Sequence, residues 1–290
     1  MDLAGLLQEK LTGDGMLTGM LAGYGEGAAV FAGQAPPDDD PGWTGEAYPR
    51  VTYVVERSEE PQQRTGGAVS FNIWSVSRSM VHPGVIGARL QELLNGGIFH
   101  PDNGPATGMR WRSACSPAVD DYDADGNLIV SLTVKFDLIN FPVQVASGSD
   151  PVSALNQWTG ETFFEAQLDP GTWMPGDGNP AVYWQVEEMQ IVEQYATASW
   201  VEARLAAYVI APTQEGRAGW VKKVMERLSL IKFLNLAEGS PLFIRAVKAD
   251  FRADYLRTGQ ISLTVRYGVG PEEETGGTYE KLNNAVLDVM

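Results

Sequence analysis

The sequence predicts an α+β fold with two tandem copies of one small domain, in which a helix packs on an antiparallel sheet. Three observations support this prediction. The chain has 290 residues, which is more than one typical domain needs. Short strings recur in its two halves at a nearly constant offset, and the same order of strand and helix patterns follows in each half. We therefore expect an N-terminal domain in residues 1–145 and a second, duplicated domain in residues 146–290.

The internal repeat is clearest in two strings of alternating residues. SLTVKF at residues 131–136 corresponds to SLTVRY at residues 262–267, an offset of 131. Pro49 and Pro180 stand at the same offset, each just before a predicted strand, and Gly126 and Gly259 precede the last strand of each half at an offset of 133. Because several independent landmarks fall near one offset, we interpret the pattern as a duplication.

The first half begins with a predicted helix and continues with strands around a second helix. Leucines at four-residue spacing predict the helix at residues 3–11, with a possible extra turn through residues 17–21. Period-2 alternation predicts strands at residues 51–55 and 69–73, joined by a turn at 62–67. Apolar residues at helical spacing between Pro83 and Gly96 predict a helix on the sheet. Strands at residues 109–115 and 128–138 close this half.

The second half repeats the order, which we write ββαββ. Its predicted strands span residues 182–192, 201–210, 243–249 and 261–269, and its helix has Val221, Val224 and Leu228 on one face. Residues 141–180 are predicted to be a linker and lead-in, so that only the first copy has an N-terminal helix. An acidic, glycine-rich tail at residues 270–277 leads into a predicted short helix at residues 279–290.

Composition excludes several classes of protein. The formal net charge is −16 and the pI is about 4.5, so the average field repels phosphate backbones and specific nucleic-acid binding is not expected. An acidic surface is still compatible with a pore through which DNA slides. No apolar stretch reaches the roughly 20 residues of a membrane helix, and the N-terminus has no signal-peptide pattern. We expect no membrane contact and synthesis in a cytoplasm.

Three aspartates form the one pattern that resembles a metal site. Asp121, Asp123 and Asp125 alternate and are followed by Gly126, as at the start of a calcium-binding loop. The twelfth position, where such a loop needs a bidentate acid, holds Leu132. Aspartate and glycine also favour turns without any ion. We therefore predict a metal-free hairpin turn and no metal site.

No other residues predict catalysis or a cofactor. Cys115 is the single cysteine, which excludes an intrachain disulfide, and its strand position favours a small buried side chain over a nucleophile. His82 and His100 flank prolines, without acidic or nucleophilic partners at triad spacing. No dinucleotide fingerprint or P-loop is present. The sequence predicts a protein that is not an enzyme and has no cofactor.

A basic cluster lies on the polar side of the second predicted helix. Lys222, Lys223 and Arg227 share this side, where they could contact phosphate or an acidic partner. A solvated helix face is the interpretation that we favour, because the surrounding chain is acidic.

The order of elements in the first half resembles the tail-terminator family of long-tailed phages, small proteins that form a ring on the tail tube. The resemblance consists of a leucine-rich N-terminal helix, a loop, the string YPRV at residues 48–51, a strand at 69–74, a helix at 84–97 and two closing strands. It covers residues 1–140 directly and the rest through the repeat.

The resemblance implies a structural virion protein at the head–tail interface, made in the host cytoplasm. It implies an α+β fold and a six-fold ring without catalysis or cofactor, which contacts the tail tube protein below and head-tail connector proteins above while DNA passes through. Duplication departs from the family pattern. Six chains would form a hexamer with an additional layer, and three chains would form a trimer with pseudo-six-fold symmetry; we lean toward six.

Two other functions remain open at this stage. The chain could be another virion subunit, from a tail tube or a head-tail connector, or a calcium-assisted binding module that uses the three aspartates. For a ring subunit, the interface should use apolar side chains left over after each core is filled. Trp74 and Val76, where the alternation of the second strand shifts phase, are the candidate subunit-interface residues.

Overall fold

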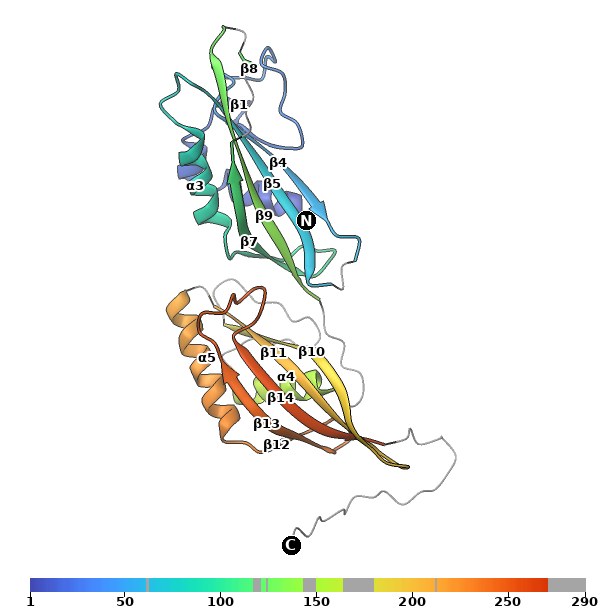
Figure 1. Ribbon diagram of the computed structural model, residues 1–290. Helices are drawn as coiled ribbons and strands as arrows, with labels where there is room; N and C mark the ends of the chain where they lie inside the picture. The colour runs from blue at the N-terminus through green and yellow to red at the C-terminus, as the bar shows by residue number, and fades with distance from the viewer. Residues whose placement is uncertain are drawn as a thin grey trace.

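The computed structural model describes residues 1–60, 63–116, 121–123, 125–142, 150–163, 180–211 and 213–270. Over these residues the predicted α+β class is confirmed, with mostly antiparallel sheets and five helices. Figure 1 shows one sheet-and-helix body formed by each half of the chain, placed end to end. No helix in the described part of the chain is long and apolar enough to span a membrane.

The first half forms a sheet with the strand order β3-β4-β5-β9-β7-β6, and β8 pairs with β9. All neighbours in this sheet are antiparallel except β3 and β4. Its elements are α1 (Leu3–Thr12), α2 (Gly15–Thr18), β1 (Gly23–Tyr24), β2 (Gly27–Ala28), β3 (Val30–Ala32), β4 (Arg50–Arg57), β5 (Thr65–Val76), α3 (Pro83–Leu94), β6 (Ile98–Phe99), β7 (Ala106–Cys115), β8 (Asp121–Tyr122) and β9 (Leu128–Phe141).

The second half forms an antiparallel sheet with the strand order β10-β11-β14-β13-β12. Its elements are α4 (Pro151–Thr162), β10 (Ala181–Gln194), β11 (Ser199–Ile210), α5 (Gln214–Ser229), β12 (Phe233–Asn235), β13 (Pro241–Ala249) and β14 (Ile261–Val269). The long predicted strands and the helix of each half are confirmed in position. The predicted tail and helix at 271–290, and the lead-in at 164–179, lie outside the described residues.

Both sheets are built in the same sequence of steps. In each sheet, two long strands form a hairpin, and a helix then leads to the far edge of the sheet. A short strand and a long strand follow there, and the last strand lies between this long strand and the second strand of the hairpin. The long strand that pairs with the last strand on its other side has a β-bulge in both sheets, in β7 at Arg112 and in β13 at Arg245. Gly126 and Gly259, which precede the last strands, have φ of 77° and 67°, a region that only glycine adopts readily.

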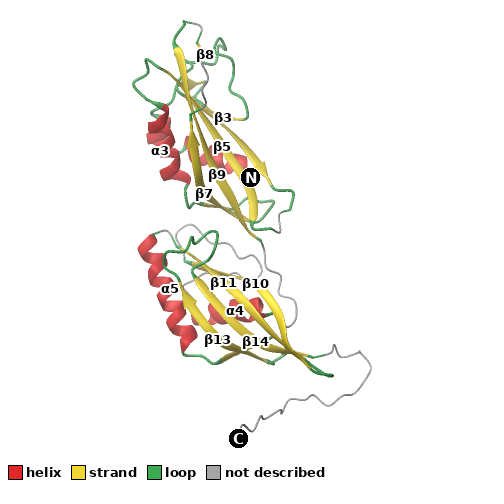
Figure 2. Ribbon diagram, viewed as in Figure 1, coloured by secondary structure: helices red, strands yellow, loops and turns green. Residues whose placement is uncertain are grey.

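The helices of each half cover one face of its sheet. In the first core, leucines of α1 and α3 pack on Val51, Phe71 and Phe136, and in the second core α4 and α5 pack on Trp184 and Leu263. Figure 2 shows the helices of both halves on the same side, so that no helix among the described residues lies on the other face of either sheet.

One aromatic side chain fixes the leading helix to the sheet in each half. The Tyr53 hydroxyl donates a hydrogen bond to the Ala4 carbonyl at 2.8 Å. Trp184, which stands at the repeat offset from Tyr53, donates from Nε1 to Oγ1 of Thr159 at 2.9 Å. Tyr53 is 1% exposed and Trp184 is 0% exposed, so both polar groups require these partners.

The prediction that only the first half has a leading helix was wrong, because α4 leads the second half. Asp150 caps this helix by accepting a hydrogen bond from the Val152 amide at 2.9 Å, and Pro151 occupies its first turn. Val152, Leu155 and Thr159 form its buried face. The Asp-Pro pair suggested a linker, although it is equally the start of a helix.

Each half also contains more strands than the predicted ββαββ order. A strand of two or three residues, β6 or β12, follows the helix before the two closing strands. These strands are too short to show any periodicity in the sequence.

Cys115 is exposed, so the prediction of a buried side chain was wrong. It ends β7, whose last four residues are all exposed. The sequence pattern predicted the strand itself but not which of its side chains another element covers.

Candidate assembly site

The two halves meet in an apolar cluster at the ends of their sheets. Ile139 and Phe141, at the end of β9, pack against Tyr183 on β10 and Tyr208 on β11. Leu256, in the turn before β14, completes the contact and is 0% exposed. Phe141 lies edge-on to Tyr183, with 5.4 Å between the ring centroids, which is a favourable geometry for aromatic pairs.

Arg64, beside the start of β5, lies among these rings. Its guanidinium carbon is 4.0 Å from the centroid of Tyr208 and 4.3 Å from that of Phe141, within the range of cation–π attraction. The same guanidinium donates hydrogen bonds to the Asn140 carbonyl at 3.1 Å and to the Leu256 carbonyl. Burial lowers the pKa of Arg64 from its ordinary value. This side chain therefore joins both halves through charge, stacking and hydrogen bonds.

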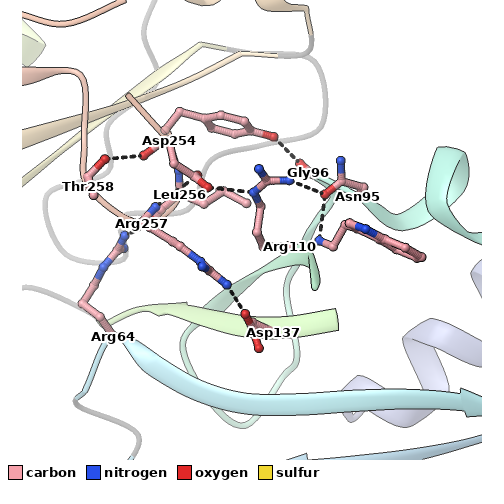
Figure 3. A network of polar contacts seen from close by, with 11 residues as sticks. Arg64, Asn95, Gly96, Arg110, Asp137, Asp254, Leu256, Arg257 and Thr258 are labelled. Carbon is pink, nitrogen blue, oxygen red and sulfur yellow. Dashed lines mark hydrogen bonds and ion pairs between the residues drawn. The ribbon is translucent and has the colours of Figure 1, made fainter. Parts of the chain in front are cut away.

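Ion pairs also join the two halves, and Figure 3 shows those of Arg110 and Arg257. Arg110 on β7 contacts Asp254 of the second half, with 2.7 Å between Nε and Oδ2. Arg257 of the second half pairs with Asp137 on β9, and Arg112 contacts the same aspartate at 3.4 Å. Each pair that crosses the junction joins an acid of one half to an arginine of the other, so the charges oppose sliding of one half past the other.

Hydrogen bonds extend this network to the helix side of the junction. The side-chain oxygen of Asn95, at the end of α3, accepts from Arg110 Nη1 at 3.2 Å and from the Trp111 amide at 2.8 Å. The Tyr255 hydroxyl donates to the Gly96 carbonyl at 3.3 Å, and Arg217 stacks over the Tyr255 ring at 4.1 Å. The arginines of the junction mainly serve to hold the two halves together.

We expect the junction to lose stability in acid because of Asp254. Burial alone would raise the pKa of Asp254, but hydrogen bonds from Arg110 and from the Leu256 and Arg257 amides outweigh it and hold this pKa below the ordinary 3.8. A carboxyl whose pKa is lowered in the folded state stabilises the protein above its unfolded pKa, and this stabilisation is lost as pH falls through the folded value.

The test compares the wild type with Asp254→Asn in denaturant titrations from pH 7 to pH 3. We expect the variant to be less stable by about 1–2 kcal/mol at pH 7 and the difference to shrink below pH 4. A difference that stays constant over this range would show that Asp254 does not titrate as the geometry requires.

The three aspartates of the predicted turn are not brought together around a common point. The Asp123 carboxylate accepts from the Asp125 amide at 3.0 Å and from the Asn127 amide at 2.7 Å, while Asp121 and Asp125 are exposed. The residues that the structure describes contain no group of three metal-binding side chains. Asp123 organises the turn before β9 through its own hydrogen bonds.

The candidate interface residues Trp74 and Val76 pack inside the chain. Val76 is 3% exposed and belongs to a small cluster with Tyr48 and Ile129, against which Trp74 is partly buried. Val76 is therefore not a side chain left over after the core is filled. A role of either residue between subunits stays a prediction.

The predicted surface residues take structural or solvated positions. His82 caps α3 by accepting a hydrogen bond from the Gly84 amide at 3.1 Å, and half-buried His100 lines a recess beside α1. Lys222 and Arg227 are exposed on α5, where Lys222 faces Glu226 at 3.8 Å. Lys223 lies over the Trp220 ring at 4.4 Å.

Sequence reasoning missed the junction. Arg64 and Leu256 are far apart in the chain, and both lie in turns, where neither period-2 nor helical spacing applies. Composition offered one indication of the junction, because arginines in turns and at strand ends are unusual in so acidic a chain. No protein-family model, curated protein or solved structure matches this chain. Candidate functions therefore depend on the residues and their geometry.

Proposed function

We propose that this chain is a structural subunit of a closed homo-oligomeric ring, of the tail-terminator kind, which caps a tail tube and joins tail to head in a virion. The observation that carries the proposal is the end-to-end fixation of two sheets with the same strand order. A subunit of this build is a rigid two-layered element, and rigid elements with repeated geometry suit a ring.

The proposal includes a duplication of one ancestral domain. It is supported by the equal strand order, by bulges at Arg112 and Arg245, and by left-handed Gly126 and Gly259. The bulge arginines and the glycines share one offset, which differs by only two positions from the offset of the SLTV strings. The first positions of the helices, Pro83 in α3 and Gln214 in α5, stand at the same offset as those strings.

The placement of the halves favours six chains over three. In a trimer with pseudo-six-fold symmetry, the two halves would lie side by side around the ring and contact each other through sheet edges or helices. Here the contact joins the strand ends of one sheet to the strand ends of the other. Six chains would then form two stacked layers, each with six copies of one half.

The polar groups of the junction support a structural role and not catalysis. The arginines and acids there neutralise one another across the two halves. A recess of about 570 Å³ beside α5 is lined by Arg217, Asp254 and Tyr255. Asp254 and Tyr255 contact the first half, and Arg217 stacks on Tyr255. We accordingly propose no enzymatic activity and no cofactor.

Electron microscopy of the purified protein tests the proposal. We expect closed rings with six-fold symmetry, two layers deep, and rings bound to one end of isolated tail tubes. In an infection without this protein, tails should run past their normal length or lack heads. A protein that stays monomeric at high concentration with tail tubes present would contradict the assignment.

Other outcomes of the same preparation favour the alternatives. Rings that bind head particles but not tube ends would indicate a head-tail connector, and long open tubes would indicate a tail-tube subunit. A monomer that binds calcium in the micromolar range, with binding lost in Asp123→Ala, would indicate a binding module.

A further inference from the structure

We infer that the second half of each subunit extends its sheet into the next copy of the chain, with the β10 edge of one copy pairing with the β13 edge of its neighbour. The β10 edge is residues 187–194, and the β13 edge is residues 245–249 together with Lys232. This inference rests on the proposed ring, because it names the contact between adjacent subunits.

The β10 edge is a long edge-strand segment whose side chains are exposed on both faces of the sheet. Strand β10 is the outermost of its sheet and pairs with β11 alone in the described part of the chain. Every residue from 187 to 194 is exposed, including Met189 at 51% and Ile191 at 63%. Exposed apolar side chains on an unpaired strand margin favour pairing with another strand.

In the first half, a short strand pairs with the outer side of the strand that corresponds to β10. Strand β4 takes the place in the first sheet that β10 takes in the second. Strand β3 pairs with its outer margin in parallel, from Val30 opposite Val51 to Ala32 opposite Tyr53. Residues 51–53 correspond to residues 182–184 of β10, whereas the β10 edge lies farther along the strand, where no described segment pairs with its outer side.

The β13 edge is the opposite margin of the same sheet and is basic. Strand β12 pairs only with residues 241–243 of β13, which leaves residues 245–249 without a strand on that side in the described chain. Arg245 and Lys248 are exposed there, and Lys232 is exposed beside them. Among the described residues, none of these three cations lies in an ion pair.

The β10 edge carries the complementary charge. Glu187, Glu188 and Glu193 project from it, and Arg204 and Arg266 partly neutralise them from neighbouring strands. An excess of acid therefore remains on this margin, opposite to an excess of base on the other. Exposed apolar residues accompany the basic margin too, since Leu230 is 76% and Phe233 is 51% exposed.

The charges of the two edges favour a head-to-tail contact between copies of the chain over a two-fold symmetric dimer. Antiparallel pairing of two β10 edges over residues 187–194 would place Glu188 of each copy opposite Glu193 of the other, and like charges in contact are unfavourable. Pairing of a β10 edge with a β13 edge places acid opposite base and leaves one edge of each kind open. Such a contact is head-to-tail, and repetition of it closes a ring when the rotation fits.

The test reverses the charge of each edge separately. We expect Glu187→Lys with Glu188→Lys, and likewise Arg245→Glu with Lys248→Glu, to weaken association by about a hundredfold or more, because like charges then meet at every contact. Lys10→Glu with Lys135→Glu makes the same change of charge in the first half as the β13-edge variant makes in the second, and it should leave association unchanged. Circular dichroism and thermal melting confirm folding, and sedimentation velocity measures the assembly.

A mixture of the two edge variants is the decisive test of head-to-tail pairing. One variant then has two basic edges and the other two acidic edges, so they should assemble only together, in alternation and in equal amounts, as native mass spectrometry would show. Raising the salt from about 0.1 M to about 1 M should reduce the effect, because the Debye length falls from about 10 Å to about 3 Å.

Three results would overturn the inference. Wild-type rings with unchanged association of both edge variants would place the subunit contact elsewhere and leave the ring proposal standing. Failure of the mixture to assemble would exclude head-to-tail edge pairing. Loss of binding to a DNA duplex by Arg245→Glu with Lys248→Glu, with assembly intact, would assign the β13 edge to phosphate contact. A wild-type protein that is monomeric throughout would instead contradict the proposed function itself.

Discussion

Replacing Leu263 with alanine is expected to lower the free energy of unfolding by about 2–5 kcal/mol, the usual range for leucine truncation in a core. Leu263 lies on β14 opposite Leu205, and both are 0% exposed within the second core. Truncation would leave a cavity between the sheet and its helices, where close packing prevents full collapse.

Leu132 provides a matched control at the corresponding place in the first half. It lies on β9 opposite Ile73 and is only partly buried against its core. It still contacts α3, because a Cβ at Gly87 would lie 2.7 Å from Leu132 Cδ2. Leu132→Ala should cost less, about 1–2 kcal/mol, since less area is removed from water in the wild type.

Denaturant titration measures both losses, and hydrogen exchange with mass spectrometry assigns them to a half. Leu263→Ala should increase exchange in β11 and β14, and Leu132→Ala in β5 and β9. Equal losses for the two variants, or a negligible loss for Leu263→Ala, would contradict the packing of β14 described above.

Replacing Arg64 with alanine is expected to separate the unfolding of the two halves. The wild type should unfold in one calorimetric transition, because each half is stabilised by its contact with the other. Without Arg64, the Asn140 and Leu256 carbonyls lose their donor and the rings of Phe141 and Tyr208 lose their cation. We expect a loss of about 2–5 kcal/mol in the coupling of the halves, seen as two transitions.

Arg64→Lys is the control for charge in this experiment. A lysine keeps the cation but cannot stack a planar group between two rings while donating to two carbonyls, so an intermediate loss is expected. Small-angle scattering should show a broader distribution of shapes for Arg64→Ala. A single transition at the wild-type temperature in Arg64→Ala would show that the apolar cluster alone couples the halves.

The sequence predicted the parts of the fold that have a regular pattern. Strand β9 was found because six apolar residues alternate along it, and α5 because Val221, Val224 and Leu228 fall on one face. These patterns exist because one side of each element is buried. Helix α4 has a comparable face, but Asp150-Pro151 suggested a linker and concealed it. The exposed end of β7, with Cys115, was misjudged because a strand pattern alone does not show which side chains another element covers.

The candidate site could not be predicted in the same way. The contacts of Arg64 with Leu256 and of Arg110 with Asp254 join turns and strand ends from different halves. Such contacts depend on how two finished domains dock, and no local spacing encodes docking.

The short connection between the halves affects how strongly they associate. Strand β9 ends at Phe141 and α4 begins at Pro151, so only a short stretch of chain tethers one half to the other. A short tether holds its attached domains at an effective concentration of about millimolar. The junction contacts can therefore be weak as a bimolecular interaction and still be formed in nearly every molecule. Substitutions at the junction can then change the angle between the halves without separating them, whereas cutting the tether would make their association depend on concentration.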